Sequence, residues 1–229
     1  MGEGGSDWQV KMADTRVILV RHGETEWNRD GRFLGWRESD LTELGRQQAG
    51  ALALALRNTP LSAIYSSPSQ RTVITAQAIN VHHGLEIHTD PRLRELNQGQ
   101  VEGLTASQIR ARFPGLLEQL NTDLTSVHLP GGETFDELQD RAWAALRDVM
   151  GAHPTSIVAV VAHMWTIKVI VARILGAPLS ATWHFTVAPG SLTIIGYEWG
   201  RLSVLNLNDT HHLACCVLRA ACWNGTRTT

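Results

Sequence analysis

The stretch RVILVRHGETEWN, Arg16 to Asn28, begins with a run of apolar and β-branched residues and continues into a polar segment that contains glycine. The run, Arg16–Val20, does not alternate between polar and apolar positions. A strand that is buried on both faces has this pattern, whereas a strand with one wet face alternates. The stretch therefore predicts a central strand of a sheet that is covered on both sides.

Further short strands are predicted along the chain, and segments rich in helix-forming residues separate them. The predicted strands are 61–67, 85–90 and 155–162, of which 155–162 is again a continuous apolar run. The predicted helices are 41–58, 68–80, 105–113 and 166–176, and a further helix lies within 129–153. Strands that alternate with helices favour a mostly parallel sheet with helices on both faces. We therefore expect an α/β fold, a three-layer α/β/α sandwich.

Several helix ends carry sequence signals of their own. Thr42 can cap the helix that follows it, and Thr134 with Glu137 forms a capping box. Pro68 suits the first turn of a helix, and Gly176 suits a helix end. Two later runs, 191–198 and 201–208, flank Trp199-Gly200 and predict a closing hairpin.

The chain shows no internal repeat, low-complexity tract or linker that would divide it. We expect one domain over residues 16–213, preceded by a flexible leader, 1–15, and followed by a C-terminal tail, 214–229. The three cysteines lie close together near the C-terminus, which is not the pattern of a disulfide framework. A reduced, cytoplasmic protein is the simplest interpretation.

Composition excludes several classes of function. The chain has 229 residues, of which 43% are hydrophobic and 18% charged, so it can bury a substantial core. Its formal net charge of −2 and the lack of a basic run argue against a nucleic-acid partner. No window is long and apolar enough for a membrane span, and the N-terminus lacks the pattern of a signal peptide.

Arg21, His22 and Gly23 follow the first predicted strand, at the sheet edge where ligands collect in α/β proteins. The arginine side chain is a planar fork suited to phosphate, and a neutral imidazole can act as a nucleophile. Glycine allows the backbone to approach a ligand closely. An RHG triplet alone also occurs as a solvated turn, so the rest of the chain must supply the partners.

The longer stretch LVRHGETEWN resembles the RHG motif of the histidine phosphatase superfamily, the phosphoglycerate-mutase-like proteins. The family's further motifs follow in order: an arginine in SPSQRTVITA, an acid in LRELNQGQVEG, the segment PGGE, and a second histidine after a late strand. In this chain those features are Arg71, Glu95, Pro130–Glu133 and His163. The resemblance extends over nearly the whole chain, from Arg16 to Leu213.

The resemblance implies a catalytic site in which His22 becomes phosphorylated. It implies that Arg21, Arg71 and His163 surround the phosphoryl group, and that Glu95 acts as the general acid and base. Asn28 and Thr25 are expected to contact the phosphate or the substrate. Glu102 is an alternative to Glu95 in the same loop, and Glu24 is expected only to help orient the first loop.

No metal and no cofactor are expected. The late segment HHLACCVLRAAC contains five potential ligands, His211, His212, Cys215, Cys216 and Cys222, but their spacing matches no common zinc pattern. The expected partner is a small phosphorylated metabolite, with no nucleic acid and no membrane. A homo-oligomer remains one alternative for the assembly state.

Three functions remain open at this stage. The interval from Glu95 to His163 lacks the long insertion of cofactor-dependent mutases, so the chain resembles the broad-specificity and α-ribazole phosphatase branch. A phosphoglycerate-mutase-type transfer and an inactive module that binds phosphorylated ligands are the alternatives. Met164 and Trp165 replace a glycine pair that is common in the family. We expect them, Trp36 and residues 113–130 to influence substrate choice, unless the two point into the core.

Overall fold

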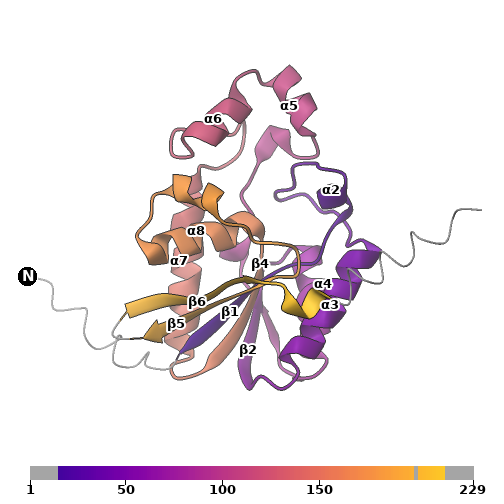
Figure 1. Ribbon diagram of the computed structural model, residues 1–229, viewed down its shortest axis with the longest axis vertical. Helices are drawn as coiled ribbons and strands as arrows, with labels where there is room; N and C mark the ends of the chain where they lie inside the picture. The colour runs from indigo at the N-terminus through magenta and orange to yellow at the C-terminus, as the bar shows by residue number, and fades with distance from the viewer. Residues whose placement is uncertain (1–14, 199–200, 215–229) are drawn as a thin grey trace, which may run out of the picture.

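The computed structural model describes residues 15–198 and 201–214 of the chain. A six-stranded sheet with the order β3-β2-β4-β1-β5-β6 forms its centre (Figure 1). The strands are β1 (Arg16–Arg21), β2 (Leu61–Ser66), β3 (Ile87–Thr89), β4 (Ile157–Ala162), β5 (Leu192–Glu198) and β6 (Arg201–Asp209). The first four pair in parallel, and β5 and β6 add an antiparallel edge.

Helices cover both faces of the sheet, as Figure 1 shows. The helices are α2 (Glu26–Arg29), α3 (Glu43–Leu56), α4 (Gln70–Asn80), α5 (Ala106–Arg112), α6 (Leu116–Thr122), α7 (Phe135–Ala152) and α8 (Met164–Leu175). Helices α3 and α4 lie on one side, and α7 and α8 lie on the other. The predicted three-layer α/β/α arrangement with a mostly parallel sheet is confirmed.

Successive residues of β1 point to opposite cores, which explains the unbroken apolar run in the sequence. Val17 and Leu19 pack in the larger core with α7 and α8, whereas Ile18 and Val20 pack in the smaller core with α3 and α4. All four side chains are at most 5% exposed. Because alternate positions face different helices, neither set of positions needs polar residues.

The helix caps follow the sequence with one exception. The Thr42 side chain accepts a hydrogen bond from Gly45 N, and Thr134 forms the predicted capping box with Glu137. Gly176 ends α8 with a φ of 61°. The placement of Pro68 in the first turn of α4 is wrong, because Ser69 is the N-cap and α4 begins one residue later.

Helices α5 and α6 lie together beyond one end of the sheet (Figure 1). Helix α5 matches its prediction, whereas α6 was not anticipated, since its seven residues are too few to show a clear helical period. A 3₁₀ segment, η3 (Leu179–His184), follows α8. Each of these three elements borders the cavity of the candidate site.

Parts of the predicted organisation fall on residues that the structure does not describe. The leader (1–15) and the tail (214–229) lie almost entirely outside the described residues, as do Cys215, Cys216 and Cys222. The hairpin strands β5 and β6 pair as predicted, although their connection at 199–200 also lies outside. Among the helices described, none has both the length and the apolar character that crossing a membrane requires.

Candidate active site

The two motif histidines meet at the carboxyl ends of two neighbouring parallel strands. In the β1–β4 register, Arg21 is opposite Ala162, so His22 and His163 follow paired positions. Their rings lie edge to face, with centroids 5.2 Å apart and planes at 64°. Parallel pairing therefore joins two motifs that are 141 positions apart in the sequence, from residue 22 to residue 163.

The tautomer of His22 follows from its hydrogen bond. Nδ1 of His22 lies 2.7 Å from the carbonyl oxygen of Gly23, which can only accept, so Nδ1 carries the proton. The lone pair of the neutral ring is then on Nε2. Burial lowers the pKa of His22 well below its usual value, and the charges of Arg71 and Arg21 lower it further. His22 is therefore neutral and nucleophilic at neutral pH.

Two arginines, the half-buried Arg21 and the buried Arg71, bring positive charge to the histidines. Arg21 donates from Nη1 to the carbonyl oxygen of Val187 at 2.6 Å, and burial lowers its pKa to about 10. Arg71 is 1% exposed and donates to the carbonyl oxygens of Arg37 at 3.0 Å and Gly35 at 2.7 Å. Both guanidinium groups remain charged at neutral pH. Among the described residues, no carboxylate accepts a hydrogen bond from the Nε atom of either arginine.

His163 is fully buried and is held from one side only. Its Nε2 lies 2.8 Å from Ser67 Oγ, which follows β2, and burial followed by the charge of Arg71 lowers its pKa well below the usual value. Nδ1 of His163 has no hydrogen-bond partner within the described chain, and the same holds for Nε of Arg21 and Nε of Arg71. Buried polar atoms normally have partners, so this cluster indicates a site for an anion.

Glu95 is the carboxylate of the site. It is 5% exposed and accepts hydrogen bonds from the backbone N–H groups of Leu96 at 2.9 Å and Trp165 at 3.1 Å. Burial raises its pKa, and this effect outweighs the opposing hydrogen bonds and the two arginine charges. A carboxyl group with a raised pKa is suited to donate a proton near neutral pH.

Glu102, the alternative acid, has a different environment. Its two carboxylate oxygens accept from the backbone N–H groups of Trp36 at 2.7 Å and Arg37 at 2.9 Å. It thereby fixes the loop whose Gly35 and Arg37 carbonyls hold Arg71. A Cβ atom at Gly35 would lie 2.2 Å from Glu102 Oε1, so only glycine allows this close approach. Glu102 does not line the cavity described below.

Thr25 and Asn28 organise the short helix α2. Thr25 is the N-cap, and the two residues form a reciprocal capping box with hydrogen bonds of 3.2 Å in each direction. Thr25 is fully buried, whereas Asn28 also lines the cavity. Glu24 accepts a hydrogen bond from the Thr42 side chain at 2.8 Å and so connects the first loop to α3.

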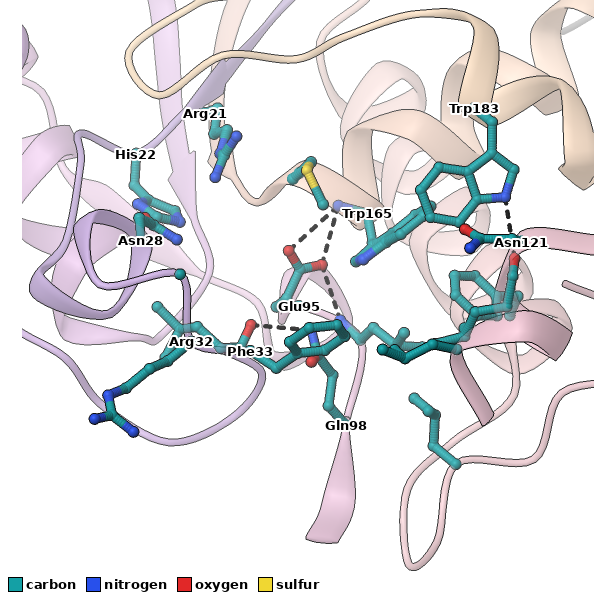
Figure 2. Close-up of a pocket in the computed structure, with 18 of the residues that line it drawn as sticks. Arg21, His22, Asn28, Arg32, Phe33, Glu95, Gln98, Asn121, Trp165 and Trp183 are labelled. Atoms are coloured by element: carbon teal, nitrogen blue, oxygen red, sulfur yellow. Dashed lines mark hydrogen bonds between the residues drawn. The ribbon is translucent and has the colours of Figure 1, made fainter. Parts of the chain in front are cut away.

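A cavity of about 420 Å³ opens beside His22 (Figure 2). Four of the expected site residues line it directly, together with both residues that replace the glycine pair: Arg21, His22, Asn28, Glu95, Met164 and Trp165. Arg71 and His163 lie beneath this surface, at 1% and 0% exposure. The cavity also has lining residues that the sequence did not point to, Phe135 of α7 and Trp183 of η3. Trp36 does not line it, but its indole N–H donates to the carbonyl oxygen of Glu95 at 2.8 Å.

Arg141 is a further residue that sequence reasoning missed. From α7 its guanidinium donates to three carbonyl oxygens of the Glu95 loop, those of Arg92, Arg94 and Glu95, at 2.6 to 2.8 Å. It also pairs with Glu133, the last residue of the PGGE segment. Glu133 in turn accepts from Asn97 N at 2.7 Å. The loop that carries Glu95 is thus held by one half-buried ion pair and its hydrogen bonds.

A nucleophilic imidazole, an anion site of buried cations and a carboxyl group of raised pKa are the components of phosphoryl transfer through histidine. The family model of the histidine phosphatase superfamily (branch 1) matches residues 17–210, which is most of the chain. The protein therefore belongs to the histidine phosphatase superfamily.

Individual relatives agree with this assignment. Phosphoserine phosphatase 1 of Hydrogenobacter thermophilus is 34% identical over 198 residues, which cover 86% of this chain and 94% of that protein. A protein named probable phosphoglycerate mutase GpmB, from Salmonella choleraesuis, is 35% identical over 183 residues, covering 80% and 85%. The solved structure of Bacillus stearothermophilus YhfR superposes with a TM-score of 0.83 at 34% identity, covering 87% of this chain and 99% of that one.

Proposed function

We propose that this protein hydrolyses small phosphomonoesters through a phosphohistidine intermediate on His22. One observation carries the proposal: the free Nε2 of a neutral His22 lies in a cavity with Glu95, next to buried cationic groups that have unused donors. The oxygens of a bound phosphate would accept hydrogen bonds from these unpaired donors. Charge stabilisation of this kind is usually the largest contribution to catalysis.

In the first half-reaction, Nε2 of His22 attacks phosphorus and the bond from phosphorus to the ester oxygen breaks. The leaving oxygen takes a proton from the Glu95 carboxyl group, which becomes a carboxylate. Arg21, Arg71 and His163 bind the three oxygens of the phosphoryl group during the transfer. The hydrogen bond from Nδ1 of His22 to Gly23 O supports this role, because it keeps Nε2 directed at the substrate.

In the second half-reaction, a water molecule occupies the place of the departed alcohol. Glu95 removes one proton from the water as its oxygen bonds to phosphorus. The bond from phosphorus to Nε2 breaks, and its electron pair returns to the ring. Inorganic phosphate leaves, and both His22 and Glu95 regain their starting protonation. The raised pKa of Glu95 supports both directions of this proton transfer.

Water is the proposed acceptor, although one relative carries the name of a mutase. The interval between Glu95 and His163 contains α5, α6 and α7 and no longer insertion. A mutase must hold a second phosphorylated molecule in place of water. Besides Arg21 and Glu95, the charged side chains among the described residues that line the cavity are Arg32 and Arg110. This lining favours hydrolysis over transfer to a metabolite.

The test is phosphate release from p-nitrophenyl phosphate by wild type and His22→Ala. Release by wild type and loss in the variant are expected. Binding of phosphate without release would instead identify an inactive binding module. Conversion of 3-phosphoglycerate that requires 2,3-bisphosphoglycerate and exceeds hydrolysis would identify a mutase.

A further inference from the structure

The cavity has two chemically different ends, and Glu95 lies between them. In Figure 2 Arg21, His22 and Asn28 lie on one side of Glu95, and Trp165 and Trp183 lie on the other. We call the end at Trp165 and Trp183 the apolar arm; Phe135 packs against Trp165 there, and the backbone of Leu120 bonds to Trp183. Leu117 and Leu129 are further apolar residues of the cavity lining. These six residues come from α6, α7, α8, η3 and the loop before α7.

The three aromatic rings of the apolar arm form one continuous wall. Phe135 and Trp165 lie edge to face with centroids 4.9 Å apart, and Trp165 and Trp183 do the same at 5.2 Å. The indole N–H of Trp183 donates to the carbonyl oxygen of Leu120 at 3.1 Å, which connects the wall to α6. Edge-to-face packing fixes the rings, so the wall is formed before any ligand binds.

A buried lysine supports the wall from behind. Nζ of Lys168 lies 5.2 Å from the ring centroid of Trp165 and 5.6 Å from those of Trp183 and Phe185. It donates to the carbonyl oxygen of Thr182 at 2.8 Å and is 6% exposed. Lys168 does not line the cavity, so its charge stabilises the aromatic rings and is not offered to the ligand.

Charged residues are few near the apolar arm. Arg32 and Arg110 line the cavity, but Arg32 donates from Nη1 to Gly103 O at 2.8 Å, and Figure 2 shows its guanidinium pointing away from Glu95. Arg110 is exposed. The remaining polar side chains of the lining, Asn28, Gln98 and Asn121, are neutral. Oε1 of Gln98 is buried without a partner among the described residues, so it could accept one hydrogen bond from a leaving group. An ammonium and a carboxylate together would still lose most of their hydration against the wall, because the aromatic rings offer no charged partner.

We infer that the substrate is a phosphomonoester of an apolar alcohol, whose hydrocarbon or ring occupies the apolar arm. The inference rests on the proposed function, in which Glu95 protonates the leaving oxygen. Because the phosphoryl group lies on the His22 side of Glu95, the alcohol extends to the other side, along the aromatic wall. A cavity of about 420 Å³ has room for both parts of such a molecule.

The first test is kcat/KM for ethyl, butyl, hexyl and 2-phenylethyl phosphate, compared with glycerol phosphate and O-phosphoserine. Burial of methylenes in the apolar arm should raise kcat/KM about fourfold for each added CH₂ until the arm is filled. 2-Phenylethyl phosphate should exceed O-phosphoserine by at least about tenfold. Equal or better hydrolysis of O-phosphoserine would overturn the inference.

The second test is Trp183→Ala, because Trp183 is 43% exposed and lies at the edge of the aromatic wall. The loss of kcat/KM for 2-phenylethyl phosphate should be at least about five times the loss for ethyl phosphate. Trp143→Ala is the matched control, since Trp143 lies on α7 against Arg173 and does not line the cavity. Trp143→Ala should change kcat/KM for both substrates by the same factor. An equal loss of kcat/KM for the two substrates in Trp183→Ala would contradict the inference.

Binding of phosphonates separates this inference from the proposed function, because phosphonates cannot be hydrolysed. Calorimetry should give 2-phenylethylphosphonate a Kd at least about tenfold below that of ethylphosphonate, and Trp183→Ala should remove most of the difference. This result would stand even if no phosphoenzyme formed and the proposed function failed. Equal Kd values for the two phosphonates would overturn the apolar arm while leaving hydrolysis through His22 intact.

Discussion

The imidazole rings of His22 and His163 lie edge to face with their centroids 5.2 Å apart, and neither residue is more than 3% exposed. Burial and nearby arginines lower the pKa of both rings well below the usual value. Both rings are therefore neutral in the free protein at neutral pH. In the proposed function, a phosphate dianion would bind next to these neutral rings and to the charged arginines.

This relationship predicts a pH dependence of stability. The folded pKa values of His22 and His163 lie below the unfolded value of about 6.5, so the unfolded chain binds protons first as the pH falls. The free energy of unfolding should therefore fall below about pH 6.5, by up to about 1.4 kcal/mol per pH unit for each histidine. Urea unfolding of wild type and His163→Asn between about pH 5 and pH 8 measures this, and the variant should show the shallower slope.

The pKa shift of Glu95 changes the pH dependence of the free energy of unfolding in the opposite direction. Its folded pKa is raised, so protonation of Glu95 stabilises the folded protein on the acid side and this contribution is lost as the pH rises through that pKa. Comparison of wild type with His163→Asn cancels the Glu95 contribution to a first approximation. Identical slopes for the two proteins would show that His163 is not buried as a neutral ring.

Glu95→Gln should have an effect that depends on the leaving group. An alkoxide needs a proton as it departs, whereas p-nitrophenolate leaves without one. We expect kcat/KM for ethyl phosphate to fall about 10²- to 10⁴-fold, and that for p-nitrophenyl phosphate to fall much less. Steady-state kinetics on the two substrates measures the difference. Equal losses would mean that Glu95 does not protonate the leaving oxygen.

The loss of kcat/KM in Arg141→Ala should depend on the leaving group as it does in Glu95→Gln, but more weakly, because Arg141 acts through the loop that carries Glu95. Without it, the carbonyl oxygens of Arg92, Arg94 and Glu95 lose a shared donor, and Glu133 loses its ion-pair partner. We expect ethyl phosphate to lose more activity than p-nitrophenyl phosphate, with partial recovery in Arg141→Lys.

The control for this prediction is Arg147→Ala, an exposed arginine on the same helix. It should leave the ratio of the two kcat/KM values unchanged. If Arg141→Ala lowers kcat/KM for both substrates by the same factor, the ion pair stabilises the fold without positioning Glu95.

Glu102→Gln should instead weaken phosphate binding for every substrate. Its carboxylate holds the N–H groups of Trp36 and Arg37, and the same loop presents the carbonyls that orient Arg71. KM for ethyl and p-nitrophenyl phosphate should rise by a similar factor, about 5- to 30-fold for a loss of about 1 to 2 kcal/mol.

Inhibition by inorganic phosphate provides the second readout, and the inhibition constant should rise with KM. Glu86→Gln, at an exposed position before β3, is the matched control. An effect of Glu102→Gln that depends on the leaving group would identify Glu102 as a proton donor and contradict its assignment to the loop.

Much of the fold follows from local pattern. The unbroken apolar runs of β1 and β4 indicate strands with helices on both faces, since the apolar side chains of β1 reach one of two cores. The capping box of Thr134 and Glu137 marks the start of α7. Those signals depend on neighbours within a few residues, so a single sequence displays them.

The shape of the cavity does not follow from local pattern. Trp183 in a 3₁₀ segment and Leu117 and Leu120 in the short helix α6 reach the cavity only through tertiary packing. Arg141 lies 46 positions from Glu95 and has the ordinary appearance of a charged residue on a helix. Motif positions at strand ends indicated the candidate site, and the expected range 113–130 includes Leu117, Leu120 and Leu129 of the cavity lining. Phe135, Trp183 and Arg141 required the structure.

The central claim is that His22 carries the phosphoryl group, and rapid quenching with ³²P-labelled substrate tests it most directly. Wild type should form one phosphoenzyme that is labile in acid and stable in base, as a phosphohistidine is. His22→Ala should form none and should lose turnover with it, whereas His163→Ala should form it slowly. Retention of the labelled enzyme or of turnover in His22→Ala would contradict the account.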